Sequence, residues 1–268
     1  MSAGWSVVIP YYNEASFLPQ TLASITAQTK RPGQLILVDN ASTDGSAEIA
    51  RAFMAQHPDI ITHFLTEPRP GQVNALEAGI AAVTTEFVAI CDADTWYPPH
   101  HLALADAQFH RAGPRTVAVM SLGLAGDPHG LRALTRRWLY AHVVSRLLRY
   151  QCHTGGYGHA FRTAALKEAG GYTTEQWSFV LFDHELMHRI FSVGGARYHA
   201  NLWCVSSDRR KDSASTRWSL IERVLYHATP FTLKDWFFYS FLQQRFAARN
   251  LSGLNLRDER AWDNATPA

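Results

Sequence analysis

The sequence predicts an α/β protein with a Rossmann-like, mostly parallel β-sheet flanked by helices. Short apolar runs without alternation, such as VVI, LILV and FVAI, are typical of parallel strands buried on both faces. Helical patterns with short connections separate these runs, as in βαβ units. Polar residues follow the runs directly, and ligands of parallel sheets bind past the carboxyl ends of the strands.

The first half of the chain alternates regularly between the two kinds of element. Apolar runs predict strands at residues 5–10, 34–38, 60–65 and 87–90. Helices are predicted from Ser16 through Ile25, after the Ser-Thr-Asp-Gly cap at 42–45, and through Leu76 and Ile80 after a Pro/Gly turn.

After Met120 this alternation stops. Residues 131–150 carry five arginines, no acid and many apolar residues, which favours a helical insertion. A Gly-rich loop and short helix (153–172), a helix (182–193), a strand (198–205) and a helical tail (216–250) follow. We therefore expect a domain at 1–215, with halves of about 1–120 and 121–215, and a helical extension at 216–268.

The composition excludes several classes of protein. A formal net charge of +2 provides no general attraction to nucleic acid. The three cysteines, Cys91, Cys152 and Cys204, lack the spacing of a disulfide framework or zinc site and are expected to be core residues. The sequence shows neither a signal peptide nor a run of ~20 apolar residues, so a cytoplasmic protein is expected.

Two carboxylates follow the fourth predicted strand, in the sequence Asp92-Ala93-Asp94. Carboxylates two residues apart in a turn can face one small volume, where a hard divalent cation would relieve their repulsion. Oxygen ligands suit Mg²⁺ or Mn²⁺. The alternative is an ordinary turn, because turns commonly contain aspartate.

Several segments, in order and spacing, resemble the inverting family-2 glycosyltransferases of the GT-A fold. SVVIPYYNE, LILVDNASTDGS and EFVAICDAD resemble the nucleotide-binding half of that family. GGYGHAFRTAALKEAGGY resembles its acceptor-side segment, and FDHEL resembles its Glu-Asp-x-Glu-Leu motif. The resemblance covers residues 4–210 and implies transfer of a sugar from a nucleotide diphosphate to an acceptor hydroxyl.

The resemblance implies a set of nucleotide contacts. Pro10, Tyr12 and Glu14 would line the pocket after the first strand. Asp39 matches the acid that hydrogen-bonds uracil or ribose, although a turn residue before a helix is the alternative. Asn74 falls where the family contacts the nucleotide or sugar.

Three acids would carry the remaining chemistry. Asp92 would face the ribose or sugar, and Asp94 would ligate the metal that bridges the phosphates. Asp183 matches the catalytic base, which takes the proton of the acceptor hydroxyl. Phe182 replaces the family's preceding glutamate, and Glu185 keeps its other acid. The alternative for Asp183 is a charge that favours a helix N-terminus.

Four arginines allow either a binding or a structural interpretation. Arg209 and Arg210 resemble a basic segment that closes over the diphosphate, and guanidinium groups fit phosphate oxygens. A solvated surface pair is the alternative. Arg69 is a weaker nucleotide candidate because it follows a turn, and Arg162 is expected to be structural.

Residues 184–188 read H-E-L-M-H, which formally matches a zinc-peptidase motif. The pattern overlaps FDHEL and has no supporting signature elsewhere, so this interpretation is discounted.

The sequence gives fewer indications of the acceptor than of the donor. The arginine-bearing segment 131–150 and the aromatic segment 231–246 favour contact with an anionic membrane, a phosphorylated acceptor or a second copy in a homodimer. A helix packed on the core is the alternative. We expect a glycan or lipid-linked acceptor, used in envelope or cell-surface synthesis at the inner face of a membrane.

The sequence thus predicts an inverting, metal-dependent glycosyltransferase that uses a nucleotide-sugar donor, with UDP favoured by the resemblance alone. One rival is a nucleotidyltransferase, which needs a Gly-rich loop where Tyr11–Glu14 stand. A second is a non-catalytic sugar-nucleotide-binding or scaffold module, which could dispense with Asp92, Asp94 and Asp183.

Overall fold

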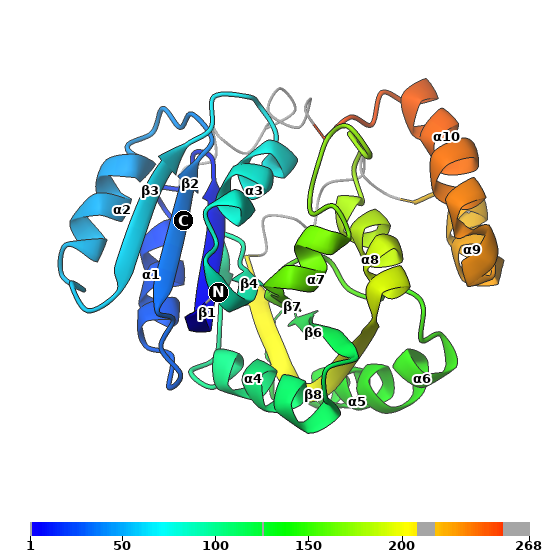
Figure 1. Ribbon diagram of the computed structural model, residues 1–268, viewed down its shortest axis with the longest axis horizontal. Coiled ribbons are helices and arrows are strands. Elements are labelled where there is room, and N and C mark those ends of the chain that lie inside the picture. The colour runs from blue at the N-terminus through cyan, green and yellow to red at the C-terminus, as the bar shows by residue number, and fades with distance from the viewer. Residues whose placement is uncertain (1, 125, 208–217, 254–268) are drawn as a thin grey trace.

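The computed structural model describes residues 2–124, 126–207 and 218–253, and it confirms the predicted fold class. Its centre is one mixed, mostly parallel sheet of eight strands in the order β3-β2-β1-β4-β7-β6-β8-β5 (Figure 1). The strands are β1 (Ser2–Tyr11), β2 (Gln34–Asp39), β3 (Ile61–Thr66), β4 (Thr85–Ile90), β5 (Thr95–Trp96), β6 (Thr116–Leu124), β7 (His159–Arg162) and β8 (Gly195–Ser206).

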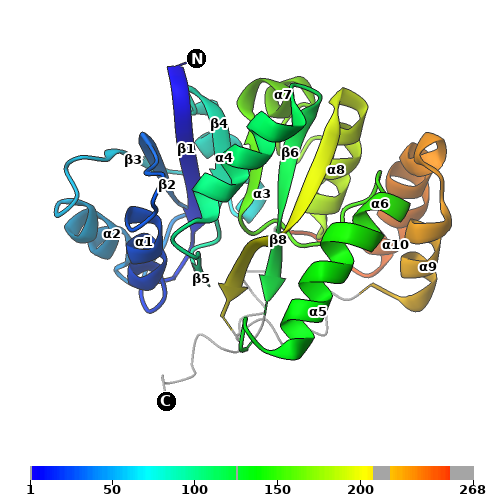
Figure 2. The same cartoon turned by 90° about the horizontal axis from the view of Figure 1, so that it is seen from below.

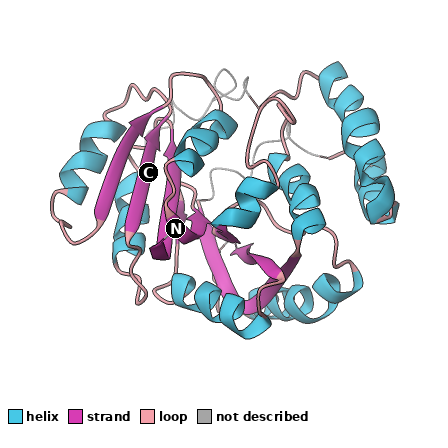
Figure 3. Cartoon of the chain, viewed as in Figure 1, coloured by secondary structure: helices cyan, strands magenta, loops and turns pink. Residues whose placement is uncertain are grey.

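Helices cover both faces of this sheet (Figures 2 and 3). One apolar core lies under α1, α2 and α4, and a second lies under α3, α7 and α8. Val7 and Ile9 of β1 belong to the first core and Val8 to the second, so this strand is buried on both faces. The helices are α1 (Leu18–Thr26), α2 (Ser46–Met54), α3 (Gln72–Ala81), α4 (His101–Ala112), α7 (Thr163–Glu168) and α8 (Phe182–Val193).

The strand register brings the predicted site residues to one edge of the sheet. Strand β1 pairs in parallel with both β2 and β4, and β2 pairs in parallel with β3. Tyr11 is opposite Asp39, and Asp39 is opposite Thr66, so these three strands end at the same level. The loops that carry Tyr12, Asp39 and Asp92 therefore leave the sheet on the same side.

Four elements were not predicted from the sequence: β5, β6, β7 and helix α4. Strand β7 has only four residues and lies antiparallel between β4 and β6. Its sequence, HAFR, carries no periodicity, so only its two partners define it as a strand. Strand β6 is buried throughout, and it extends past Met120, where the sequence pattern seemed to break.

The predicted helical insertion consists of α5 (Leu131–Leu139), a π-helical segment (Tyr140–Val144) and α6 (Ser145–Leu147). The C-terminal region is helical as predicted, with α9 (Leu220–Ala228), a 3₁₀ turn (Phe231–Leu233), a π-helical segment (Trp236–Leu242) and α10 (Gln243–Ala248). No helix in these described stretches combines the length and apolar character needed to cross a bilayer.

The C-terminal helices have an aromatic core of their own. Phe237, Phe238 and Phe246 are buried against Trp177 and Val180, which precede α8. Much of the aromatic segment at 231–246 is thus packed inward, and Trp236 remains half exposed.

Candidate functional site

The loop after β1 is fixed by residues that follow β2. Asn13 adopts a left-handed backbone with φ 53°, and its side-chain oxygen accepts a hydrogen bond from the Thr43 amide at 2.8 Å. The Glu14 amide donates to the Ser46 hydroxyl at 2.8 Å, and the Ala15 amide donates to Asp44 at 2.9 Å. These bonds give the loop of Tyr12 and buried Glu14 a defined shape before any ligand binds.

Asp39 and Pro10 lie at the strand ends as predicted. Pro10 is buried in β1 opposite Val38, and Asp39 is half-buried at the end of β2. One carboxylate oxygen of Asp39 accepts a hydrogen bond from the Ser42 amide at 2.9 Å, which orients the side chain within the loop.

Asn40 joins the loops after β2 and β3. Its side-chain nitrogen donates to the carbonyls of Glu67 and Arg69 at 2.8 and 2.7 Å, and its oxygen accepts from the Gly71 amide at 3.0 Å. Buried Asn74, in the first turn of α3, donates in turn to the Pro70 carbonyl at 2.8 Å.

The Asp92–Asp94 turn is held by side chains from different parts of the fold. Gln72 of α3 donates to Asp92 at 3.1 Å, and the Ser207 hydroxyl donates to Asp94 at 2.9 Å. Thr21 of α1 donates to the intervening Ala93 carbonyl at 2.7 Å. Asp92 and Asp94 are each only 5% exposed, so their positions are fixed by packing as well as by hydrogen bonds.

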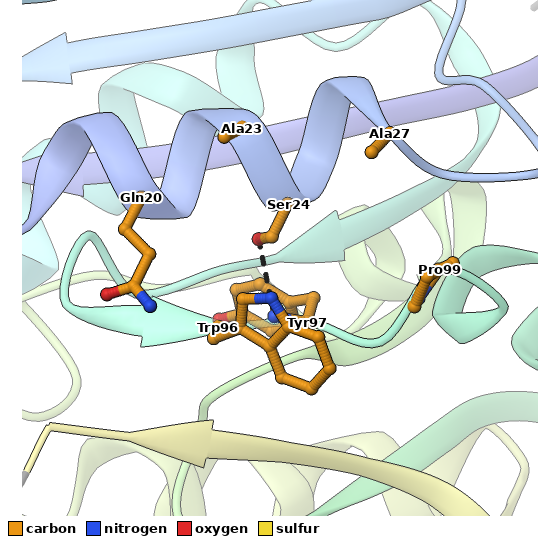
Figure 4. A pocket seen from close by; sticks show the side chains of 7 residues that line it. All are labelled: Gln20, Ala23, Ser24, Ala27, Trp96, Tyr97 and Pro99. Atoms are coloured by element: carbon orange, nitrogen blue, oxygen red, sulfur yellow. Dashed lines mark hydrogen bonds between the residues drawn. The ribbon is translucent and has the colours of Figure 1, made fainter.

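Tyr97 supports this turn from the side of α1. Its hydroxyl accepts a hydrogen bond from the Asp92 amide at 2.8 Å, and its own amide donates to Ser24 at 3.2 Å (Figure 4). A hollow of about 210 Å³ lies beside it, between α1 and the 96–99 segment. None of the predicted site residues lines that hollow.

The side chains of the turn fit a divalent cation that is shared with substrate. In the described part of the chain, no three His, Cys, Asp or Glu side chains gather to hold a metal by themselves. Asp94 supplies a buried, hard carboxylate, and Mg²⁺-type ions are commonly bound by one or two carboxylates with phosphate oxygens and water. The donor set therefore suits an ion that arrives with a diphosphate.

Asp183 lies at the N-terminus of α8, two residues after Leu181, whose backbone is left-handed with φ 64°. This conformation starts the helix and turns the Asp183 carboxylate toward the Gly-rich loop before β7. One of its oxygens accepts a hydrogen bond from the Gly156 amide at 2.9 Å, and the other accepts from the Tyr172 hydroxyl at 3.3 Å. A Cβ at Gly156 would lie 2.1 Å from the carboxylate, so only glycine permits this approach.

Tyr172 is the buried hydrogen-bond partner of Asp183. Burial raises the pKa of its phenol well above the ordinary value, and the negative charges of Asp183 and, to a smaller extent, Asp92 raise it further. Tyr172 consequently remains a hydrogen-bond donor at neutral pH. Thr174, two residues later, donates to Asn74 at 3.5 Å, so this segment contacts both α8, through Asp183, and α3, through Asn74.

The basic candidates lie in different parts of the chain and have different partners. Arg209 and Arg210 lie outside the described residues. Arg69 forms a two-pronged ion pair with Glu67 at 2.9 Å on the surface, which favours a role in the turn over one in ligand binding. Arg162 donates to Glu86 and to the Thr116 carbonyl, in agreement with its predicted structural role.

The H-E-L-M-H side chains are engaged in structural pairs. Glu185 is buried and binds Arg189 at 2.7 Å and the Tyr239 hydroxyl, which fastens the C-terminal helices to α8. His188 lies 2.6 Å from Asp235. The His184 ring packs against aromatic rings at its edge. These contacts give the motif a packing role. The three cysteines are buried, as expected.

Sequence reasoning gave no role to several residues that shape the site. Gly156 and Tyr172 lie inside the segment that carries the family resemblance, and Asn40 lies two residues after a predicted strand. These positions in the sequence were the only features that pointed to a role in the site. Their partners are distant in the chain, since Gly156 meets Asp183 across 27 positions and Asn40 meets Gly71 across 31.

Comparison with known proteins places the chain among enzymes of sugar transfer. An undecaprenyl-phosphate 4-deoxy-4-formamido-L-arabinose transferase from Serratia proteamaculans is 29% identical over 170 residues, which cover 55% of this chain and 52% of the relative. This chain thus spans about half of that relative's length.

Solved structures share the fold. The mannosyltransferase PcManGT from Pyrobaculum calidifontis, in complex with GDP-Man and Mn²⁺, superposes with a TM-score of 0.66 and 25% identity, covering 87% of this chain and 64% of that one. Glucosyl-3-phosphoglycerate synthase from Mycobacterium tuberculosis, in complex with Mn²⁺, UDP and phosphoglyceric acid, has a TM-score of 0.56 and 20% identity, covering 85% and 79%. The sequence pattern described as Glycosyl transferase family 2 matches residues 6–170, more than half of the chain, and this protein therefore belongs to that family.

Proposed function

We propose that this protein transfers a sugar from a UDP-sugar to an acceptor hydroxyl with inversion at the anomeric carbon, assisted by Mn²⁺ or Mg²⁺. The observation that carries the proposal is that two acidic positions are each fixed by side chains of other segments: Gln72 and Ser207 bind the Asp92–Asp94 turn, and Tyr172 binds Asp183. A donor bound at the first position would present its anomeric carbon toward the second.

The nucleotide would bind at the carboxyl ends of the parallel strands. Asp39 would accept hydrogen bonds from uracil or ribose, in a pocket lined by Pro10, Tyr12 and Glu14. Asn74 and Asp92 would contact the nucleotide or sugar. The preformed hydrogen bonds of the loops after β1 and β2 support this assignment, because ordered loops lose little conformational entropy on binding.

Asp94 would hold the divalent ion. Such an ion, when bound, neutralises the charge that develops on the departing diphosphate. Arg209 and Arg210 would add positive charge at the same phosphates.

Asp183 would act as the general base. Its carboxylate takes the proton of the acceptor hydroxyl while the new bond from that oxygen to the anomeric carbon forms. The bond from the anomeric carbon to the phosphate oxygen breaks on the opposite side, and UDP leaves. The Gly156 amide and the Tyr172 hydroxyl keep the carboxylate in place, and a single displacement of this kind inverts the anomeric centre.

The acceptor would be a glycan or a lipid-linked molecule used in envelope or cell-surface synthesis. The Serratia relative is named for transfer to undecaprenyl phosphate, which supports a lipid-linked class. We accordingly expect the enzyme to act in the cytoplasm at the inner face of a membrane.

Thermal unfolding with UDP, with and without Mn²⁺, tests the nucleotide site. Ligand at about a hundred times its Kd should add roughly 2.7 kcal/mol and raise Tm by several degrees. Asp94→Asn should abolish the dependence on Mn²⁺, whereas the exposed carboxylate change Asp59→Asn should keep it. A Tm shift with GDP but not with UDP would indicate that the donor nucleotide is GDP. If no nucleotide shifted the Tm, the proposed nucleotide site would be contradicted.

Asp183→Asn separates binding from transfer. This variant should keep the UDP-dependent Tm shift and lose transfer by roughly 10²- to 10⁴-fold, the usual contribution of a general base. NMR of the product's anomeric proton checks inversion. Full transfer activity in Asp183→Asn would exclude Asp183 as the base.

A further inference from the structure

Helix α5 turns several apolar side chains to the solvent and one of its three arginines to the protein. Arg137 is buried, and it donates hydrogen bonds to the Ala200 carbonyl at 2.7 Å, the Pro128 carbonyl at 3.0 Å and Asn201 at 3.2 Å. The next residue, Trp138, is 58% exposed. A surface helix ordinarily has the opposite arrangement, with its apolar stripe toward the core.

The outward side chains of α5 form one stripe. Leu131 is 80% exposed and Leu134 is 44% exposed, and their spacing with Trp138 is i, i+3, i+7, which places all three on one face of the helix. Leu147 of α6, at the far end of the insertion, is 77% exposed. Contiguous apolar surface of this kind marks a contact with another apolar body.

The insertion itself carries only positive charges, and the acid that precedes it is the exposed Asp127, before the start of α5. Arg132, Arg136, Arg146 and Arg149 are exposed along the insertion, and no Asp or Glu occurs anywhere from residue 128 to 167. An apolar stripe flanked by arginines is complementary to a surface that combines acyl chains with negative headgroups.

Two hollows beside the insertion are likewise lined by basic and apolar side chains. The first, of about 420 Å³, lies between the end of α6 and the end of α9, and its lining includes Arg146, Arg149 and Lys234. The second, of about 470 Å³, is lined by Val144, Trp218 and Arg223 among others. Neither hollow has an acidic residue in its lining. Figure 2 places α5 and α6 along the outer side of β6 and β8, near α9.

We propose that the α5–α6 insertion docks the protein on an anionic lipid bilayer, with Leu131, Leu134 and Trp138 in the acyl–headgroup boundary and the flanking arginines on lipid phosphates. The last helix of the insertion ends at Leu147, and the Gly156 amide that binds Asp183 follows nine residues later. Docking would hold the protein at the surface of the bilayer. The inference rests on the proposed function for its purpose, because a lipid-linked acceptor would be presented there, but its test requires no donor or acceptor.

Flotation of the full chain with vesicles tests the surface. The wild type should float with vesicles of phosphatidylcholine and phosphatidylglycerol, should remain unbound with phosphatidylcholine alone, and should detach as salt is raised. Arg132→Gln/Arg146→Gln should weaken partitioning by roughly 25-fold, about fivefold for each charge. Leu131→Ser/Trp138→Ser should weaken it by about tenfold or more.

Matched controls lie on other parts of the molecule. Ile61→Ser removes a side chain that is 66% exposed on β3, and Arg111→Gln/Arg115→Gln removes two exposed charges near α4. Both should float like the wild type. A retained UDP-dependent Tm shift in every variant would show that the nucleotide site is folded, which separates failure of docking from failure of the proposed function.

Two kinds of result would overturn the inference. One is equal flotation of wild type and both insertion variants, or no flotation of the wild type. The other is a concentration-dependent dimer, measured by sedimentation, that Leu131→Ser/Trp138→Ser abolishes in the absence of vesicles. That result would assign the apolar stripe to a second copy of the chain.

Discussion

The carboxylate of Asp183 is positioned by two donors that belong to separate segments of the chain. The Gly156 amide and the Tyr172 hydroxyl bind its two oxygens, and the left-handed backbone of Leu181 sets the direction of the side chain. Each hydrogen bond orients the carboxylate and also stabilises its negative charge. Activity should therefore respond to small displacements at this point.

Gly156→Ala tests this sensitivity. The new Cβ would lie 2.1 Å from a carboxylate oxygen, so either the loop or Asp183 has to move. We expect transfer to fall by at least about 100-fold, as misplacement of a catalytic group by ~1 Å does, with UDP binding retained. Initial rates and the UDP-dependent Tm shift provide the measurement.

The matched control is Gly195→Ala, where the added Cβ would meet nothing nearer than the Arg115 carbonyl at 3.6 Å. This variant should transfer sugar at the wild-type rate. If Gly156→Ala were equally active, the Gly156 contact would not position the base.

The site residues that were predicted have positions fixed by the local sequence. Those that were missed have roles fixed by contacts with other segments. Asp92 and Asp94 follow a buried apolar run, so their place at the sheet edge follows from the run itself. Gly156 and Tyr172 acquire their roles from the direction of Asp183, which depends on the conformation of Leu181. No local pattern in the sequence specifies a left-handed leucine.

At the scale of single elements, α3 packs unusually close to the sheet. A Cβ at Gly79 would lie 2.5 Å from Val8 and 3.0 Å from Val38. The glycine therefore permits the contact between α3 and the strands β1 and β2. The first turn of the same helix carries Gln72 and Asn74, so its distance from the sheet affects the proposed nucleotide site.

Gly79→Ala should lower the free energy of unfolding by about 1 kcal/mol. Alanine favours a helix by up to ~1 kcal/mol over glycine, but overpacking a close contact costs ~1–3 kcal/mol, and the second effect is larger here. Urea unfolding provides the measurement. In the double variant Val8→Ala/Gly79→Ala the loss should be smaller than the sum of the single losses. Greater stability of Gly79→Ala would mean that the interface has room.

The C-terminal extension depends on one buried acid, Glu222 of α9. It completes a capping box with Ser219 and binds Arg245 at 2.9 Å and Arg249 at 3.0 Å, which joins α9 to α10. Its side chain is fully buried, whereas the two arginine side chains remain about 40% exposed.

Glu222→Ala should destabilise the extension by about 2 kcal/mol. This is less than the ~3–5 kcal/mol of a fully buried pair, because both arginines can return to water. Hydrogen exchange should accelerate in residues 220–250 and remain unchanged in β1–β4. The control is Glu48→Ala, an exposed first-turn acid of α2. Uniform acceleration over the whole chain would instead make the extension part of the main cooperative unit.

Elements of uniform burial were predictable, and elements defined by their partners were not. Strands β1, β2 and β4 appear as apolar runs because both of their faces are covered. Strand β7 is short and antiparallel, and its pairing with β4 and β6 is what makes it a strand. The helices of the insertion were predicted, but the direction of their apolar face was not, because Arg137 and Trp138 are neighbours in the sequence.

For the whole molecule, buried histidines make stability depend on pH. Burial lowers the pKa of His153 to about 4 and those of His159 and His184 to about 3. In the unfolded chain these groups take up protons below about pH 6.5, whereas in the folded protein they do not. Stability should therefore fall as the pH drops from 6.5 toward 3 and should vary little above 7.

Unfolding in urea at pH 7.5 and 5.5 measures this effect. Each of the three histidines should remove about 1 kcal/mol at the lower pH. His159→Asn should reduce the pH dependence whatever its effect at pH 7.5, and His63→Asn, at an exposed position of β3, should leave it unchanged. Equal stability of the wild type at the two pH values would mean that the buried rings gain protons without cost.

The position of β7 in the sheet affects how the chain folds during synthesis. Strand β4 ends at Ile90, but the partner that covers its outer edge begins at His159, 69 positions later (159 − 90). A nascent chain that has emerged only as far as β4 therefore carries an open strand edge, which can pair with other chains. Closure of the sheet has to wait for the ribosome to deliver β7, and a fragment ending before His159 should aggregate.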